Sequence, residues 1–371
     1  MKAESLYIHF PFCESKCHYC DFYSIGREKT KTTDADFYEK ALHAECELWA
    51  DQLAPRLKSI FFGGGTPSMT PVESMRRALE PLKLSNKVTS ETEWTMEANP
   101  SSVELESLKS YRDLGVNRVS MGVQAMRDDL LLRLGRVHSR DAALRALENI
   151  SRAGFTNFSV DLLCGVPGQT IEDLSSAMEV LTSFPITHLS CYLLTLPKTH
   201  RMFRELPKDD DQLAHLLFID EKMRSKGFRH YEISNFAKPG FEAKHNLVYW
   251  QGGSYLGLGP SAHSFSPTDR ARWKNVSSLH AYGKKVGLGE KPIEWREDLT
   301  DEQLDLERWM LALRLDQGFP RTWLDSPARL QKAAGLTTAG LIEPHPEFTD
   351  RLRLTPRGFA LSDQVIQTLG I

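Results

Sequence analysis

The sequence predicts an α/β protein, an open and partial barrel of about six βα units followed by a small winged-helix-like domain. Short apolar runs alternate with longer stretches whose apolar residues recur at helical spacing, which indicates parallel βα units. Polar and glycine residues follow the ends of at least five of the predicted strands. Because a doubly wound sheet gathers its ligands at one switch point and a barrel gathers them from all its strands, this distribution favours a barrel.

Each predicted strand is a short run of apolar residues that favour β structure. In chain order the strands are Leu6–Phe10, Ser59–Phe62, Glu93–Met96, Arg118–Gly122, Phe158–Leu163 and His188–Leu194. Between them, Asp36–Leu53 and Asp141–Ala153 carry apolar residues at helical spacing and predict two of the connecting helices.

The sequence changes in character near residue 290, where we place a boundary between domains of residues 1–290 and 291–371. Asp301–Leu315 predicts an amphipathic helix, Arg351–Gly358 a strand that leads into a turn, and Phe359–Leu369 a closing helix. This size and order are typical of a winged-helix-like module. Because it has no clustered basic helix, a role as a lid or in docking a partner is favoured over DNA binding.

Composition and charge exclude several classes of protein. Of the 371 residues, 41% are hydrophobic and 26% charged, which is ordinary for a globular protein. The formal net charge of −3 gives no support for a nucleic-acid-binding surface. No stretch approaches the roughly 20 apolar residues of a transmembrane helix, and the first residues do not form a secretion signal. A cytoplasmic protein is therefore expected.

Three of the six cysteines, Cys13, Cys17 and Cys20, fall within eight residues directly after the first predicted strand. In a reducing compartment this crowding indicates metal or redox chemistry. Three thiolates on one loop suit a [4Fe–4S] cluster that keeps one iron open for a small chelating ligand. A structural zinc site normally has four ligands, and no second cysteine pair follows. The other three cysteines lie in apolar or helical stretches and are expected to be inert core residues.

The motif Cys-x-x-x-Cys-x-x-Cys, with an aromatic residue before its last cysteine, resembles the signature of radical S-adenosylmethionine (SAM) proteins. The longer string from Tyr7 to Cys13 (YIHFPFC) resembles the oxygen-independent coproporphyrinogen III oxidase family. The resemblance covers nearly the whole chain. It implies a TIM-like partial (β/α)6 barrel whose [4Fe–4S] cluster binds SAM at the open iron and cleaves it reductively to a 5′-deoxyadenosyl radical.

The resemblance also implies which residues contact SAM, in a family described with two SAM molecules. Residues 59–67 (SIFFGGGTP) are a strand that runs into a triple-glycine turn. This is either a tight turn or a close approach of the backbone to a ligand. Asp161 could equally be a buried carboxyl group satisfied by backbone donors. The positions that the resemblance assigns to SAM are Tyr7, Tyr19, Gly64, Gly65, Thr66, Glu97, Gln124, Arg136 and Asp161.

Two features distinguish this chain from the oxidase itself. The oxidase has a further cysteine two residues beyond the third cluster cysteine, where this chain has Phe22. The oxidase also has an N-terminal extension that covers its substrate, and this chain starts only a few residues before its first predicted strand. Both differences favour a branch of the family with another activity.

The segment from His245 to Trp250 (HNLVYW) resembles the His-Asn-x-x-Tyr-Trp motif of haem chaperones in this family. These proteins bind haem and deliver it to acceptor haemoproteins such as respiratory enzymes. His245 is then a candidate iron ligand, beside two aromatic residues that suit a macrocycle. The alternative is a loop histidine satisfied within the fold. Further candidate ligands are His9, His138 and His263.

Three functions follow from these observations. The first is a haem chaperone that holds a cluster, SAM and haem, which Phe22 and the His245 motif favour. The second is a SAM-dependent oxidase that decarboxylates two propionates of coproporphyrinogen III. The third, a zinc-stabilised module without redox chemistry, is disfavoured by the companion motifs.

Overall fold

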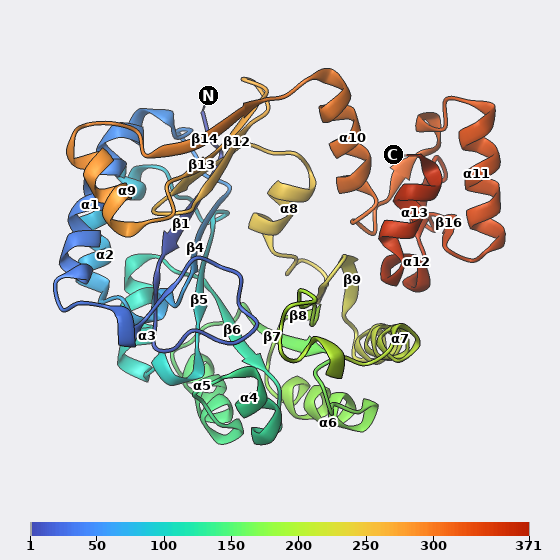
Figure 1. Ribbon diagram of the computed structural model, residues 1–371, viewed down its shortest axis with the longest axis horizontal. Coiled ribbons are helices and arrows are strands. Elements are labelled where there is room, and N and C mark those ends of the chain that lie inside the picture. Colours follow the sequence, from blue (N-terminus) through green and yellow to red (C-terminus); the bar gives the residue numbers. More distant parts are fainter. Residues whose placement is uncertain (1, 371) are drawn as a thin grey trace.

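The computed structural model describes residues 2–370, so Met1 and Ile371, at the outer ends of the two predicted domains, lie outside the described residues. Six parallel strands lie side by side in chain order and are joined by helical connections (Figure 1). The predicted partial barrel is confirmed, with all six predicted strands in place. These are β1 (Ser5–Phe10), β4 (Ser59–Gly64), β5 (Glu93–Ala98), β6 (Arg118–Gln124), β7 (Phe158–Cys164) and β8 (His188–Leu193).

Side chains along these strands alternate between two faces of the sheet. One face is apolar and packs into the main core, where Ile8, Ile60 and Met121 are fully buried. The other face carries polar groups such as Glu97 and Asp161, which line cavities inside the barrel. The interior is therefore open and polar, whereas closed barrels fill theirs with branched apolar side chains.

Helices cover the outer face of the six parallel strands (Figure 1). The predicted helices at 36–53 and 141–153 correspond to α1 and α5. Cys46, Cys164 and Cys191 are buried in the main core, as expected for inert thiols. The covering helices are α1 (Asp34–Trp49), α2 (Val72–Leu79), α3 (Leu105–Leu114), α4 (Asp128–Leu134), α5 (Arg140–Arg152) and α6 (Ile171–Thr182).

The sheet extends beyond the parallel strands at both edges. Strand β11 pairs in parallel with β1 and begins an antiparallel extension, and β10 and β9 follow β8. Strand β14 lies beyond the boundary predicted at residue 290 and still belongs to the large sheet. The added strands are β9 (Arg229–Glu232), β10 (Asn235–Ala237), β11 (Tyr255–Leu258), β12 (His263–Ser266), β13 (Ala271–Asn275) and β14 (Ile293–Asp298). Helices α7 (Asp209–Ser225) and α9 (Leu279–Gly287) connect parts of these edges.

Helix α8 (Lys244–Trp250) closes the barrel at the end where the parallel strands begin. The Glu93 carboxylate, at the start of β5, accepts hydrogen bonds from the backbone N–H groups of Lys244 and His245 at 3.0 and 3.1 Å. An acceptor at this place satisfies donors that a helix leaves free in its first turn. The helix is therefore fixed across the floor of the barrel, opposite the end at which the cysteine loop follows β1.

The C-terminal module has its own apolar core, which includes Trp309, Phe319 and Val365. Three short strands in the order β15-β17-β16 form its sheet, in agreement with the predicted winged-helix-like pattern. Its elements are α10 (Asp301–Ala312), β15 (Phe319–Pro320), α11 (Pro327–Thr338), β16 (Ile342–Pro344), β17 (Arg351–Leu354), α12 (Pro356–Ala360) and α13 (Ser362–Leu369).

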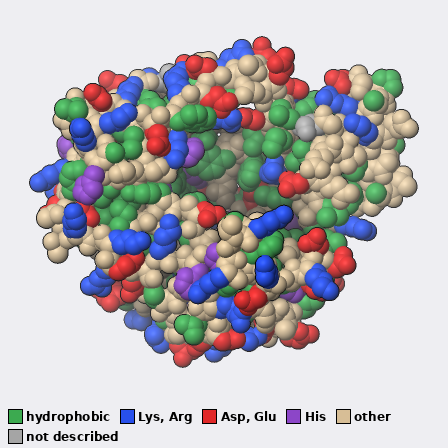
Figure 2. All heavy atoms as spheres, in the orientation of Figure 1, with side chains coloured by type: hydrophobic (Ala, Val, Ile, Leu, Met, Phe, Trp, Pro, Cys, Tyr) green, Lys and Arg blue, Asp and Glu red, His purple; other side chains and the backbone are tan. Residues whose placement is uncertain are grey.

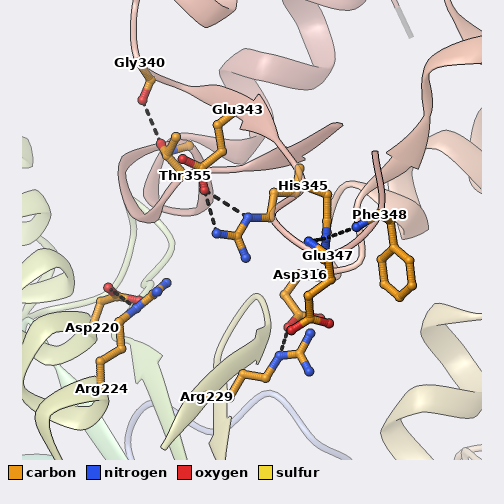
Figure 3. Close-up of polar contacts among 12 residues, drawn as sticks. Asp220, Arg224, Arg229, Asp316, Gly340, Glu343, His345, Glu347, Phe348 and Thr355 are labelled. Carbon is orange, nitrogen blue, oxygen red and sulfur yellow. Dashed lines mark hydrogen bonds and ion pairs between the residues drawn. The ribbon is translucent and has the colours of Figure 1, made fainter. Parts of the chain in front are cut away.

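Residues of strand β9 and the residue that follows it contact this module (Figure 3). The guanidinium of Arg229 forms an ion pair with Asp316, and the N–H of Ile233 donates to the carbonyl of Arg314 at 3.0 Å. Within residues 2–370, none of the helices is long and apolar enough to cross a membrane.

Candidate cluster and ligand site

The three cysteines of the predicted cluster motif share one cavity at the end of the barrel where the parallel strands finish. Short strands β2 (Phe12–Cys13) and β3 (Ile25–Gly26) pair and close the loop that carries them. All three thiols are partly exposed and line a cavity of about 320 Å³, which we call the cluster cavity. Thr66 Oγ1 lies 3.7 Å from Cys13 Sγ, and Arg136 Nη1 donates to Cys17 Sγ at 3.5 Å.

This arrangement fits a cluster better than a single metal ion. Among residues 2–370, no three His, Cys, Asp or Glu side chains are placed to hold one metal ion, as a structural zinc site would require. Three thiolates that each bind a different iron of a [4Fe–4S] cluster do not need to meet at one point. Burial raises the pKa of Cys13 and Cys20, and the Arg136 guanidinium supplies positive charge that favours the thiolate. The donor set is therefore suited to a cluster held by three thiolates.

The triple-glycine turn packs against the cysteine loop. The N–H of Gly65 donates to the Phe10 carbonyl at 2.6 Å, and a Cβ at Gly65 would lie 2.5 Å from the Phe12 carbonyl oxygen. Gly64 has φ +107°, and its N–H donates to the Glu97 carboxylate at 3.1 Å. The turn needs glycine both for the close approach of two backbones and for this conformation.

Asn99 links the glycine turn to Arg136. Its Nδ2 donates to Thr66 Oγ1 at 2.8 Å, and its Oδ1 accepts from Arg136 Nη2 at 2.7 Å. The guanidinium is thereby fixed beside Cys17. The sequence analysis did not single out Asn99, although it directly follows β5, the kind of position that identified the other polar candidates.

Gln124 ends β6 in a strained conformation. Its φ is +68°, in the left-handed region that residues with a side chain seldom adopt. The pairing of β6 with β7 shifts register between Gly122 and Gln124, which is a β-bulge. Strain of this kind costs on the order of 1–3 kcal/mol and is commonly found at functional sites. Gln124 is one of the residues that line the cluster cavity.

The structure brings most of the predicted SAM residues together. One predicted residue, Tyr7, instead lines the larger cavity described below, with its hydroxyl 3.0 Å from His9 Nδ1. The cluster cavity is lined by the three cysteines together with Tyr19, Gly64, Gly65, Thr66, Glu97, Gln124, Arg136 and Asp161.

Glu97 and Asp161 lie where the two cavities meet, and both line each of them. Burial and the neighbouring Asp161 raise the pKa of Glu97 to about 8. Burial also raises the pKa of Asp161, against the opposing effects of Ser190, Arg118 and Ser120. Both carboxyl groups lie in the barrel interior, where their removal from water is the main cause of both raised pKa values. Two such carboxyl groups favour the binding of a cation.

Glu97 is expected to release a proton when SAM binds. Its pKa of about 8 leaves it mostly protonated at pH 7, and a nearby sulfonium or ammonium group favours the carboxylate. SAM binding at pH 7 should release close to one proton, and the affinity should rise by up to about tenfold per pH unit between pH 6 and 8. Calorimetric titration in buffers of different ionisation enthalpy measures this release. The Glu97→Gln variant should release none, and equal release by both proteins would contradict the assignment.

A second cavity of about 590 Å³ occupies the barrel interior between the cluster cavity and helix α8. We call this cavity the lumen. Its walls include the aromatic side chains of Tyr7, Phe61, Tyr249 and Tyr255. Phe22 borders both the lumen and the cluster cavity and is 68% exposed. The lumen therefore offers aromatic surface beside the cluster cavity, at a volume typical of small-molecule sites.

His245 borders the lumen from helix α8, and both of its ring nitrogens are bonded. Nδ1 lies 2.8 Å from Ser59 Oγ, and Nε2 lies 2.7 Å from the Tyr249 hydroxyl. Burial, aided by the charge of Arg118, lowers the pKa of His245 to about 3, so the ring is neutral. To bind iron through a ring nitrogen, His245 would have to give up one of these two bonds.

The other candidate histidines differ in their surroundings. His9 is bonded through both ring nitrogens, to the Tyr7 hydroxyl and to the Tyr23 carbonyl. His138 lines neither the lumen nor the cluster cavity. His263 is an exposed residue of the lumen wall, and its ring has no hydrogen-bond partner within residues 2–370. His263 is thus the lumen histidine whose ring is free to bind a ligand without breaking a bond.

A third cavity of about 710 Å³ lies between the barrel and the C-terminal module, bounded by α8, β11, β13 and α10. We call it the groove. Figure 2 shows the molecule hollowed in this region, with hydrophobic side chains on the walls. Tyr249 and Tyr255 belong to the walls of both the groove and the lumen.

Comparison with known proteins identifies relatives over most of the chain. Residues 7–181 match the family model of the radical SAM superfamily. The chain is 34% identical to the heme chaperone HemW of Mycobacterium tuberculosis over 98% of this chain and 94% of the relative. It is 37% identical to HemW of Bacillus subtilis and 34% identical to HemW of Escherichia coli, each over 85% of this chain and 84% of the relative.

The fold also matches a solved structure over nearly its whole length. Coproporphyrinogen III oxidase (HemN) from Escherichia coli, described as a radical SAM enzyme, superposes with a TM-score of 0.83 at 22% identity, over 99% of this chain and 90% of that one. At this identity the likeness shows a shared fold.

Proposed function

The chain belongs to the HemW family of radical SAM proteins, and from this premise we propose that it binds a [4Fe–4S] cluster, SAM and haem and transfers haem to acceptor haemoproteins. The observation that supports this proposal is the lumen, an aromatic-walled cavity of about 590 Å³ directly beside the three-cysteine cavity. A flat, largely apolar cargo suits such walls.

In this proposal Cys13, Cys17 and Cys20 hold the cluster. A cluster held there would supply an open iron for the amine and carboxylate of SAM and an electron for the cleavage of SAM. Arg136, fixed by Asn99, places positive charge beside the cysteine loop. The remaining predicted SAM residues of the cluster cavity would contact the rest of the molecule.

We propose two histidines of the lumen as candidate ligands for haem iron. His245 belongs to the motif that resembles those of haem chaperones, but it must release the Tyr249 hydroxyl or Ser59 to bind iron. His263 requires no such release. An imidazole is a common axial ligand of haem, and a neutral ring is the form that ligates.

The alternative function is that of a coproporphyrinogen III oxidase. Phe22 counts against it, because this exposed aromatic residue stands where the oxidase has a further cysteine. Phenylalanine cannot act as a thiol, and at the border of the two cavities it adds apolar surface for a cargo.

One experiment with anaerobically reconstituted protein separates the two functions. The protein is supplied with coproporphyrinogen III, SAM and a reductant, and separately titrated with haem. We expect stoichiometric haem binding, no protoporphyrinogen, and transfer of the bound haem to an apo-haemoprotein. Formation of protoporphyrinogen at a useful rate would contradict the chaperone proposal, and so would a failure to bind haem.

A further inference from the structure

A ring of buried polar residues surrounds the floor of the lumen, at or next to the start of each parallel strand. All of its members are less than a tenth exposed. We call it the floor ring, and it consists of Ser5 (β1), Ser59 (β4), Glu93 (β5), Arg118 (β6), Ser159 (β7) and His188 (β8). Buried polar groups in proteins are nearly always hydrogen-bonded, so each member needs a partner.

Every member of the floor ring except Arg118 has a partner. Ser59 donates to Ser5 at 2.9 Å and lies 2.8 Å from His245, while Glu93 accepts from the first turn of α8. Ser159 bonds to His188 Nδ1 at 2.9 Å, and His188 Nε2 lies 2.9 Å from the hydroxyl of Tyr231. These contacts fully explain the polar character of the other five positions.

Arg118 is 2% exposed and has no side-chain hydrogen bond or ion pair within residues 2–370. Its Nε is buried without a partner, and the residue lines the lumen. A buried charge that lacks a partner is strongly unfavourable, because water is removed and nothing replaces it. Arg118 therefore lowers the stability of the folded protein when no ligand is bound.

None of the groups that face Arg118 forms an ion pair with it among residues 2–370. Burial, strengthened by the charge of Arg118, lowers the pKa of His188 and His245, so these imidazoles are neutral. Asp161 lines the same cavity and feels the charge of Arg118, but it accepts hydrogen bonds from Ser120 and lies too far from Arg118 to form an ion pair. The floor of the lumen thus presents a guanidinium to a cavity with aromatic walls.

We propose that Arg118 forms a carboxylate-binding subsite in the floor of the lumen, distinct from the cluster cavity. A guanidinium binds a carboxylate through two parallel hydrogen bonds, which would satisfy the unpaired donors. The ligand is a carboxylate attached to a body that fills the lumen. Two sources supply this chemistry, and each rests on one part of the proposed function: a propionate of haem, and the α-carboxylate of a second SAM molecule, since that of the first is assigned to the open iron.

The test compares four reconstituted proteins: the unchanged chain, Arg118→Met, Arg118→Lys and, as a matched control, Arg112→Met. Arg112 is exposed on the outside of the barrel, donates to the Ala153 carbonyl, and lines neither the lumen, the cluster cavity nor the groove. Each protein is titrated with haem, with haem dimethyl ester, whose propionates carry no charge, and with SAM. The melting temperature of each ligand-free protein is measured in parallel.

We expect Arg118→Met to melt at or above the temperature of the unchanged chain, because it removes an unpaired buried charge. Its affinity for either haem or SAM should fall at least tenfold. The ligand whose binding is weakened is the one whose carboxylate binds Arg118. Binding of the ester should not change, Arg118→Lys should recover part of the affinity, and Arg112→Met should bind like the unchanged chain.

The subsite is excluded if Arg118→Met weakens the binding of neither haem nor SAM. It is also excluded if Arg118→Met weakens the binding of haem dimethyl ester as much as that of haem. A marked fall in its ligand-free melting temperature would also overturn the proposal, since Arg118 would then serve the fold. If the unchanged chain binds no haem, the proposed function fails, and the SAM titration still decides the subsite.

Discussion

Replacing Cys13, Cys17 or Cys20 with serine will abolish cluster assembly, so reconstituted protein will contain almost no iron and will bind SAM poorly. A [4Fe–4S] cluster held by three thiolates loses one of its three protein ligands in each variant, and no fourth cysteine lies in the cluster cavity among residues 2–370 to replace it. Iron and sulfide analysis with electron paramagnetic resonance of the reduced protein measures the outcome.

The matched control for these variants is Cys46→Ser, which changes a thiol buried in the main core. It should keep full iron content while lowering the free energy of unfolding by about 1–3 kcal/mol, because a hydroxyl group replaces a thiol in an apolar site. Full iron content in any of the three cluster variants would show that the cysteine loop does not hold the cluster.

Replacing His245 with leucine will lower the free energy of unfolding by about 2–4 kcal/mol in the ligand-free protein. The substitution removes the imidazole that joins Ser59 of β4 to Tyr249 of α8 and leaves the Tyr249 hydroxyl without this partner. Denaturant unfolding followed by circular dichroism measures the loss. A change below about 0.5 kcal/mol would show that the floor does not depend on this contact.

Three variants, His245→Leu, Tyr249→Phe and His263→Ala, decide which histidine binds haem iron. Tyr249→Phe frees Nε2 of His245 but keeps the imidazole, so it should ease ligation by His245 and leave ligation by His263 unchanged. A Soret band altered in His245→Leu identifies His245 as the ligand. A band altered in His263→Ala and unchanged in His245→Leu identifies His263.

The barrel could be predicted from the sequence because its signals are local. Six apolar runs such as Ser59–Phe62 mark the strands, and polar residues at or next to their ends, Glu97 and Gln124 among them, mark the site. Parallel strands bring these ends to one edge, so listing them in the sequence already predicts that they meet. The cluster cavity confirms that they do.

The floor of the barrel could not be predicted in this way, because it depends on contacts between distant residues. His245 meets Ser59 across 186 positions, and nothing near either residue indicates the pairing. The alternative interpretation of His245 placed it in a loop, whereas the structure places it in α8, where the Glu93 carboxylate caps a short helix. Arg118 went unnoticed as the first residue of a predicted strand, although a charge that opens an apolar strand is the signal that could have drawn attention to it.

The pairing of β1 with β11 sets the order in which the sheet can be completed during synthesis. Tyr7 lies opposite Gly257, so one edge of β1 stays unpaired until some 250 further residues have been made. At cellular rates of translation this takes roughly 10–50 s. During that time β4 can pair with the other edge of β1, while the first edge stays open to other chains. The strand that leads into the cysteine loop is thus made long before its second edge is covered, and the nascent protein depends on rapid completion of its C-terminal half.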